Sequence, residues 1–469
     1  MNLHATRLAT ALATALLVSG CATLVPPVPA AQPQVPQAWP LPEHTTAPAG
    51  ALDVADIGWR EVLVDPRLQR VVAQALDNNR DLRVAVLNVE RARAQYRIRR
   101  ADRVPSVGAN AGMERVGGDV PTSESYTAGV GIASFELDLF GRVRNLSEAA
   151  LQQFFAQAEN RRAAQIALIG EVSSSWLALA ADESLAAIAR DTLRTYEEAL
   201  RLAERRHEIG VISGLELAQA RTQVEAARLD LARYEGDVAQ GRNALDLLAG
   251  AQVAESDRPG GFEEGLVAMP PLPAGLSSDV LLRRPDIRAA EHVLLGANAN
   301  IGAARAAFFP SISLTGSAGT ASDTFSGLFD AGSRIWRFAP QINLRIFQGG
   351  RLRANLGMAT ADRDIALANY EKAIQTGFRE VADALALAQT LADGRAAAER
   401  LLTAAQQAET LSAARYNAGR DSYLQRLDAQ RTLYSAQQAA LQARLAEQLN
   451  RVALYRALGG GWRDADGPQ

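Results

Sequence analysis

Two long stretches of the chain place apolar residues at helical spacing with no proline to interrupt them. They extend from about 142 to 209 and from about 351 to 418. Each predicts a helix of roughly 65 residues, which is about 100 Å long at 1.5 Å per residue. The segment after the first stretch contains a heptad repeat of apolar residues: Leu217, Val224, Leu231, Val238 and Leu245. This repeat predicts a coiled-coil seam between neighbouring helices.

Four shorter segments alternate apolar with polar residues, the pattern of β-strands with one apolar face. In chain order they lie at about 106–114, 134–139, 311–318 and 336–346. A helix from 65 to about 103 precedes the first pair, and a helix from about 285 to 307 precedes the second. Pro105 and Pro310 interrupt these helices. Each half is therefore predicted as helix, strand, loop, strand, very long helix, tip and helix.

The turn between the last two helices of each half has the same residue pattern. Gly210 is followed by Ser213, and half the chain later Gly419 is followed by Ser422. A glycine ends a helix readily because it adopts the left-handed conformation, and a serine with Glu or Gln three residues later begins the next helix as a capping box. The two turns therefore predict two helical hairpins and an internal duplication.

The duplication divides the chain into a series of segments with predicted boundaries. These are a signal peptide (1–20), a lipidated and Pro-rich extended linker (21–64), a first repeat (65–258), a Gly- and Pro-containing connector (259–276), a second repeat (277–461) and a C-terminal tail (462–469).

The N-terminus has the features of a secretory signal that ends in a lipidation motif. Arg7 is followed by the apolar run Leu8 to Val18, which is too short to span a bilayer. The run leads to Leu-Val-Ser-Gly-Cys, which resembles the bacterial lipobox, and Cys21 is the single cysteine of the chain. An ordinary signal peptide with a chance cysteine is the alternative. We expect Cys21 to be lipidated and to anchor the chain in the outer membrane.

Composition narrows the class of protein. The formal net charge is −3, which gives no indication of nucleic-acid binding. The four histidines show no metal-ligand spacing, and no Ser-His-Asp arrangement or phosphate-binding loop is recognisable. We therefore expect no cofactor, no metal and no enzymatic activity.

The predicted strands raise a closure problem. No apolar run is long enough for a transmembrane helix, yet a secreted lipoprotein carries four alternating strands of membrane-barrel length. Four strands cannot close a barrel, and an open sheet edge cannot face lipid. We therefore expect an α+β membrane protein in which several chains share one barrel. A small soluble sheet packed on helices would explain the alternation equally well.

Several motifs resemble the TolC family, in particular its lipoprotein branch, the OprM/NodT-type outer-membrane factors. They are Leu-Leu-Arg-Arg-Pro-Asp-Ile-Arg-Ala-Ala-Glu at 281–291, Phe-Pro at 309–310, Leu-Asp-Ala-Gln at 427–430 and Ala-Leu-Gly-Gly-Gly-Trp at 457–462. The resemblance implies a homotrimer with a twelve-stranded barrel above a periplasmic tunnel of long antiparallel helices. It also implies docking to a periplasmic adaptor (membrane fusion) protein and to an inner-membrane pump, usually of the resistance-nodulation-division type.

The resemblance also implies roles for particular residues. In the family the tunnel closes at the periplasmic helix tips, and the matching positions here are Asp428, Leu424, Tyr416 and Arg415. We hypothesise that three Leu424 side chains form a plug beside a ring of Asp428 carboxylates, with Tyr416 and Arg415 holding the hairpins together. A solvated helix end is the alternative for these residues.

Two further groups of residues are candidates for function. Gly210, Ser213, Gly419 and Ser422 would form the hairpin tips that contact the adaptor, although simple turn chemistry explains them as well. The polar face of the strands would line the pore with Glu136, Asp138, Asn343 and Arg345, unless these pair across strands.

The expected function is a passive outer-membrane exit duct of a tripartite efflux system for drugs or other small toxic compounds. The alternative is the outer-membrane channel of a type I protein or peptide secretion system. A purely structural coiled-coil lipoprotein would not need the four alternating strands.

Overall fold

The computed structural model describes residues 23–39, 57–269 and 277–460. Cys21, the predicted signal peptide, Trp462 and part of the Pro-rich linker lie outside these residues. The described residues belong to two compact units. Those within Met1–Gln32, Leu87–Glu159 and Arg288–Lys372 form the strand unit, and those within Pro33–Val86, Asn160–Ile287 and Ala373–Gln469 form the helical unit.

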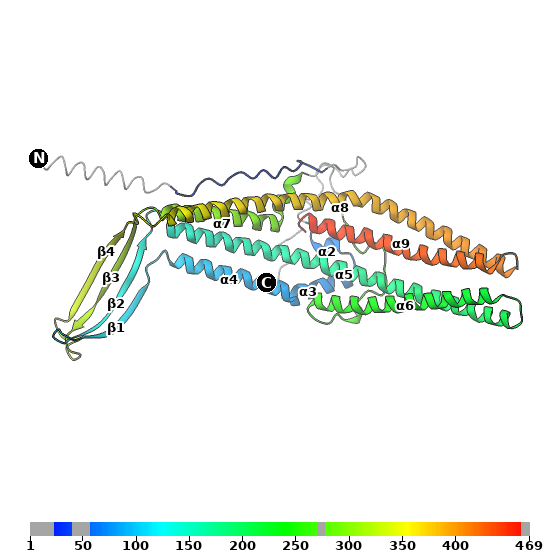
Figure 1. Cartoon of the computed structure of the whole chain (residues 1–469), viewed down its shortest axis with the longest axis horizontal. Helices are drawn as coiled ribbons and strands as arrows, with labels where there is room; N and C mark the ends of the chain where they lie inside the picture. The colour runs from blue at the N-terminus through cyan, green and yellow to red at the C-terminus, as the bar shows by residue number, and fades with distance from the viewer. Residues whose placement is uncertain (1–22, 40–56, 270–276, 461–469) are drawn as a thin grey trace. The chain divides into compact units, whose positions relative to one another are not determined.

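The strand unit contains one antiparallel sheet with the strand order β1-β2-β3-β4 (Figure 1). Its strands are β1 (Val107–Val116), β2 (Ser123–Leu137), β3 (Ser311–Ser322) and β4 (Arg334–Asn343). Within one chain, β1 and β4 are the two edges, and each is paired on one side only. The pairing joins the first repeat to the second through β2 and β3.

The sheet has one apolar face, and a β-bulge keeps that face continuous. In the ladder between β2 and β3, Ile132 pairs with Gly316 and Phe135 pairs with Leu314, so β2 has an extra residue at this point. Ser134 adopts φ 49°, and its backbone N–H donates to Thr315 Oγ1 over 3.2 Å. Side chains alternate faces along a regular strand, so residues three positions apart, such as Ile132 and Phe135, would point to opposite sides. The bulge absorbs the extra residue and returns both side chains to the same side.

Six helices longer than 20 residues form most of the described structure (Figure 1). They are α4 (Arg80–Ala101), α5 (Arg142–Glu208), α6 (Gly214–Ala249), α7 (Pro285–Ala306), α8 (Arg351–Asn417) and α9 (Tyr423–Ala457). The shorter elements are α2 (Trp59–Val62), α3 (Pro66–Asn78), η2 (Glu255–Asp257) and η3 (Ser278–Arg283). The two very long helices, α5 and α8, have 67 residues each, in agreement with the Pro-free stretches.

The helix predicted from 65 to about 103 is two helices, α3 and α4, with a break at Asn79. Asn79 has an extended backbone with ψ 131°, and its side chain accepts a hydrogen bond from the Leu82 N–H over 2.9 Å. The Asn79 Nδ2 also donates to the Leu248 carbonyl at the end of α6. Gly250 follows that end with φ 71°, and a Cβ at Gly250 would lie 2.4 Å from the Asn78 carbonyl oxygen. The end of α6 therefore packs directly against the break.

The heptad residues of α6 form the predicted seam with α5. Leu217, Val224 and Leu245 are buried, and Leu231 and Val238 are partly buried. Gly241 lies in this seam, where a Cβ would be 3.3 Å from Leu179 of α5. The small residue permits the close approach of the two helices.

The described part of the linker is an extended segment that runs along α7 and α8. In the strand unit, Asn298 Nδ2 donates to the Pro26 carbonyl. In the helical unit, the Trp39 indole stacks on Phe378 with ring centroids 5.1 Å apart. These contacts agree with the extended conformation expected from the prolines.

Among the described residues, one helix reaches the hydropathy expected of a membrane span. An 18-residue window of α5 has a mean hydropathy of 1.3, although the sequence predicts no apolar run long enough for a transmembrane helix. Because 61% of this window is buried inside the protein, the apolar side chains of α5 serve its packing against other helices.

Candidate functional site: the helix tips

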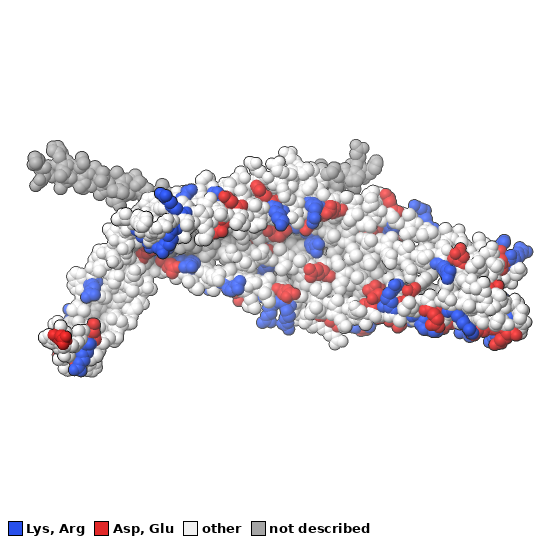
Figure 2. All heavy atoms as spheres, viewed as in Figure 1, with Lys and Arg blue, Asp and Glu red and all other residues white. Residues whose placement is uncertain are grey.

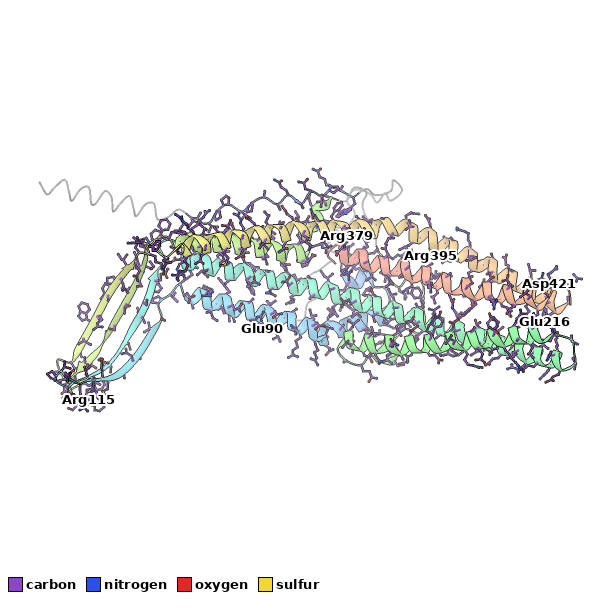
Figure 3. All side chains as sticks on the ribbon, in the orientation of Figure 1. Glu90, Arg115, Glu216, Arg379, Arg395 and Asp421 are labelled. Atoms are coloured by element: carbon purple, nitrogen blue, oxygen red, sulfur yellow. The ribbon has the colours of Figure 1, made fainter. Side chains whose placement is uncertain are left out.

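The two hairpin turns have closely similar local structures. Gly210 and Gly419 both adopt left-handed conformations, with φ 76° and 70°. Ser213 Oγ accepts a hydrogen bond from the Glu216 N–H over 3.2 Å. Ser422 forms a full capping box with Gln425, as its sequence predicts. Glu216 and Asp421 mark the two turns at one end of the hairpins (Figure 3).

An apolar group, here called the tip cluster, joins the two hairpins near these turns. It consists of Ala203, Leu217, Ala220, Tyr423 and Leu427. Leu427 is 2% exposed, whereas its neighbours Leu424 (57% exposed) and Asp428 point out of the cluster and are accessible in the single chain. The α9 surface therefore divides into a face that packs within the chain and a face that carries Leu424 and Asp428.

Tyr416 is held between two arginines at the tip cluster. Arg206 of α5 donates from Nη1 to the Tyr416 hydroxyl over 2.6 Å. The guanidinium carbons of Arg206 and Arg426 lie 5.4 and 5.1 Å from the centroid of the Tyr416 ring, within cation–π range. The hydrogen bond connects the first hairpin to the second. Arg206 was not predicted, because nothing in its local sequence distinguishes it from the neighbouring Arg205.

Arg415 has its partner in its own hairpin. The sequence predicts that it helps to hold the hairpins together, and within the single chain its guanidinium binds Asp421 across the α8–α9 turn through bonds of 2.8 to 3.0 Å. The hydrogen bond from Arg415 lowers the pKa of the Asp421 carboxyl. Among the described residues, Arg415 therefore stabilises the α8–α9 turn and makes no bond to the first hairpin.

A row of polar contacts continues the connection between α6 and α9 away from the tips. Three side-chain hydrogen bonds of 3.0 to 3.1 Å make up this row: Arg431 to Gln223, Tyr434 to Asp230, and Gln438 to Tyr234. They repeat at intervals close to helical turns, so they follow one line along the two helices. The sequence shows these residues only as polar positions, and their pairing depends on how the hairpins dock.

The predicted pore-lining residues lie at the ends of strands, and the two acids have partners. Glu136 accepts hydrogen bonds from Arg142, with the shortest at 2.5 Å. Asp138 follows β2 and accepts from the backbone N–H groups of Val143 and Arg144 over 3.1 and 2.7 Å. Asp138 thus caps the start of α5, which is a favourable place for a carboxylate.

The other two predicted pore residues also lie at a strand end. Asn343 is the last residue of β4, and Arg345 lies beyond it. The strand predicted up to residue 346 is therefore shorter. Residues of the described ranges contain no group of three or more His, Cys, Asp and Glu side chains that could hold a metal ion.

Four antiparallel strands per chain, joined to duplicated long helical hairpins, define a class of outer-membrane channel. The family model described as "Outer membrane efflux protein" matches residues 71–251 and 276–460. The chain therefore belongs to the outer membrane efflux protein family, which is the TolC family expected from its motifs.

Relatives and solved structures agree with this membership. The chain is 45% identical over 465 residues to the antibiotic efflux pump outer membrane protein ArpC of Pseudomonas putida, covering 97% of this chain and 95% of the relative. It is 42% identical to the probable outer membrane lipoprotein SilC of Salmonella typhimurium, over 96% of this chain and 98% of that one. The open-state MtrE outer membrane channel of Neisseria gonorrhoeae superposes with a TM-score of 0.86 at 41% identity, covering 94% of this chain and 98% of MtrE.

These findings establish the class of function. The protein is a non-enzymatic outer-membrane channel component of efflux pumps, and it extends from the outer membrane into the periplasm.

Proposed function

We propose that three copies of this chain close a twelve-stranded barrel and form the exit duct of a tripartite efflux system. The observation that supports this most directly is the four-stranded sheet with two unpaired edges, β1 and β4. An open edge in the hydrocarbon region would leave backbone N–H and C=O groups without partners, at several kcal/mol for each group. Pairing β4 of one copy with β1 of the next satisfies both edges.

The exposed side chains of the sheet fit a lipid-facing surface. Trp336 (79% exposed), Phe338 and Ile342 alternate along β4, and Val107 and Val130 lie on the same face by strand register. Figure 2 shows that the sheet surface in view carries few charged side chains between its loop end and its helical end. Apolar residues on one face and Ser, Thr, Gln and Asn on the other are the pattern of a membrane barrel with a wet interior.

The periplasmic end would close at the second hairpin. In this proposal Leu424 and Asp428 face the threefold axis. Both side chains are exposed in the single chain, and Asp428 forms no ion pair with any described residue. The Arg206–Tyr416 hydrogen bond holds this hairpin to the first one, and opening would require it to break. Arg415 contributes by keeping the α8–α9 turn in shape.

The partners follow from the channel class. The exposed turns with Gly210, Ser213, Gly419 and Ser422 would contact a periplasmic adaptor protein, and the adaptor would connect to an inner-membrane pump of the resistance-nodulation-division type. Lipidation of Cys21 would anchor each chain in the outer membrane, with the segment boundaries given above. Relatives named for antibiotic and toluene efflux support small toxic organic compounds as cargo over secreted proteins.

The test combines oligomeric state with transport. The purified full chain in detergent is expected to have three times the mass of one 50.0 kDa chain, apart from the signal peptide and lipid. A monomer would contradict the shared barrel. A deletion strain is expected to accumulate antibiotics and solvents. A deletion that leaves accumulation unchanged but blocks secretion of a protein would favour the type I alternative.

A further inference from the structure

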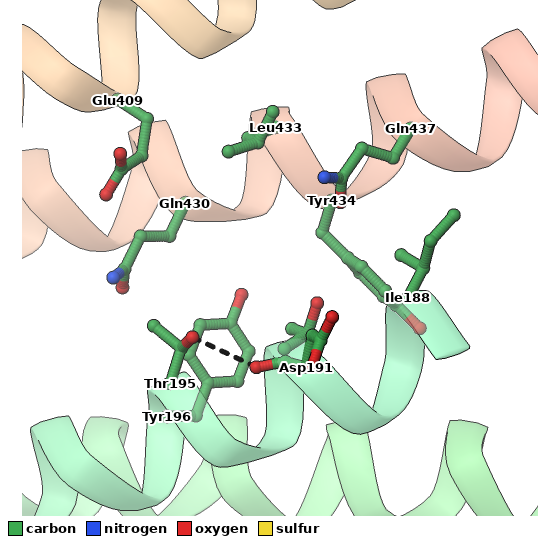
Figure 4. Close-up of a pocket in the computed structure, with 10 residues that line it drawn as sticks. Ile188, Asp191, Thr195, Tyr196, Glu409, Gln430, Leu433, Tyr434 and Gln437 are labelled. Atoms are coloured by element: carbon green, nitrogen blue, oxygen red, sulfur yellow. Dashed lines mark hydrogen bonds between the residues drawn. The ribbon is translucent and has the colours of Figure 1, made fainter. Parts of the chain in front are cut away.

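A cavity of about 250 Å³ lies between α5 of the first hairpin and α8 and α9 of the second (Figure 4). A space of about 10–15 Å³ is enough for one water molecule, so this cavity has room for an organic molecule. Tyr196 and Gln430 are its most buried lining residues, and Asp191 and Glu409 provide carboxylates from α5 and α8. None of these four residues is among the proposed gate residues.

Two buried polar side chains of the cavity lack partners within the described chain. Tyr196 and Gln430 are each 6% exposed. The Gln430 Nε2 is fully buried and makes no hydrogen bond. The Tyr196 hydroxyl also has no partner among the described residues, but its oxygen is not completely shielded from solvent. Burial raises the pKa of Tyr196 to about 12, so its hydroxyl stays protonated at neutral pH and can donate. In Figure 4 the Gln430 amide and the Tyr196 hydroxyl point into the same space.

Such groups indicate an occupant, because buried donors are almost always satisfied. Leaving one without a partner costs about 1–3 kcal/mol relative to its hydration in water. The Gln430 Nε2 meets this condition. The neighbouring Tyr196 hydroxyl has no partner among the described residues, and both groups can donate to an acceptor atom such as a carbonyl oxygen.

The charged residues that line the cavity indicate the charge that an occupant would carry. Its lining includes two acids, Asp191 and Glu409, and no Lys, Arg or His. Asp191 is paired with Arg194 over 3.1 Å at the exposed rim, whereas Glu409 has no ion-pair partner among the described residues. The rings of Tyr196 and Tyr434 also line the cavity, and aromatic faces attract cations.

We propose that this cavity is a binding site for a small organic cation, a guanidinium or amine compound that also carries a carbonyl oxygen. Glu409 pairs with the cationic group beside the tyrosine rings, and the Tyr196 hydroxyl and the Gln430 amide donate to the carbonyl. Tyr434 contributes its ring only, because its hydroxyl already donates to Asp230 over 3.1 Å. A bound cation touches both hairpins at once.

The probes are N-acetyl-argininamide and its neutral isostere N-acetyl-citrullinamide, which differ in charge at nearly equal shape. Binding to the detergent-solubilised full chain is measured by isothermal titration calorimetry. We expect the cation to bind about fivefold more tightly, the size of effect expected from a partly exposed ion pair. The assay needs no open channel, so its result is separate from that of the gating proposal.

Variants localise the binding. Glu409→Gln should abolish the preference for the cation, and Tyr196→Phe, which keeps the ring, should weaken both probes. The matched control is Glu198→Gln, an exposed acid of α5 that does not line the cavity and should change neither affinity. Equal affinity for the two probes, a preference that survives Glu409→Gln, or a preference that is lost in the Glu198→Gln control would each overturn the proposal. The last outcome would mean that general surface charge attracts the cation.

Discussion

The Arg206 guanidinium donates a 2.6 Å hydrogen bond to the Tyr416 hydroxyl, although the two residues are 210 positions apart in the chain. Each belongs to the end of a 67-residue helix, Arg206 to α5 and Tyr416 to α8. Because the two helices come from different repeats, this contact connects the first hairpin with the second hairpin, which carries the proposed gate residues.

We predict that Tyr416→Phe favours the open channel. The substitution keeps the ring between the two arginines and removes the hydroxyl, so it loses a partly exposed hydrogen bond of about 1 kcal/mol, or roughly fivefold in the opening equilibrium. The measurement is single-channel conductance in planar bilayers. Arg206→Ala should act in the same direction, and the double variant should add little to it.

The control for this contact is Arg205→Ala. Arg205 is exposed and has the same charge, but its side chain has no partner among the described residues. If Arg205→Ala raised conductance as much as Tyr416→Phe, a general loss of positive charge would explain the effect, and the contact would have no part in closure.

The proposed gate itself predicts a second conductance change. Leu424→Ser and Asp428→Ala should each increase the closed-state conductance, because three copies of each change would remove apolar and charged groups from the axis. The first hairpin offers a matched control in Leu215→Ser, since Leu215 occupies the corresponding helix position and is similarly exposed. An unchanged conductance in both second-hairpin variants would remove Leu424 and Asp428 from the gate.

Gly250 provides a prediction about stability. A Cβ at this position would lie 2.4 Å from the Asn78 carbonyl oxygen, and its φ of 71° disfavours other residues. Gly250→Ala should therefore lower the free energy of unfolding by about 1 kcal/mol or more. The measurement is the thermal unfolding temperature, which should fall. Gly236→Ala is the control, because nothing lies within 4 Å of its added Cβ inside α6. It should stabilise the protein by about 0.5–1 kcal/mol, and a loss of stability in both variants would contradict this account.

Asp65 predicts a dependence of stability on pH. Its carboxylate caps α3, accepting from the Arg67 N–H over 2.7 Å and pairing with the Arg67 guanidinium. Burial opposes ionisation, but the bonds from Arg67 outweigh it and lower the pKa of Asp65 below its ordinary 3.8. Because the folded pKa is the lower one, the stabilisation is complete above the ordinary value and is lost as the pH falls through the folded value.

Two substitutions of Asp65 distinguish the stability contributed by its helix-capping hydrogen bond from that contributed by its negative charge. Asp65→Ala should cost about 1 kcal/mol at neutral pH, and Asp65→Asn should cost less because its oxygen can still accept the backbone bond. Thermal unfolding followed by circular dichroism between pH 3 and about 7 measures both effects. The difference between wild type and Asp65→Asn should shrink at the acid end, and a constant difference would contradict a role for the carboxylate charge.

Local patterns were sufficient to predict the repeated elements. The Pro-free stretches, the alternating segments and the Gly–Ser turns each depend on residues a few positions apart, so period and cap chemistry identify them. The same patterns could not predict the bulge at Ser134 or the break at Asn79. Both depend on residues that are distant in the chain, Thr315 for the bulge and Leu248 for the break.

The sequence by itself determined the duplication, the long helices, the four strands and the family through its motifs. Only the tertiary structure decided the partners of the polar side chains: Tyr416 bonds Arg206, Arg415 bonds Asp421 within its own turn, and Asp138 caps α5. The physical reason is the separation in sequence between the residues that interact. Helix and strand periods arise from neighbouring residues, whereas a hydrogen bond depends on which distant backbone the packing of the apolar faces brings within about 3 Å.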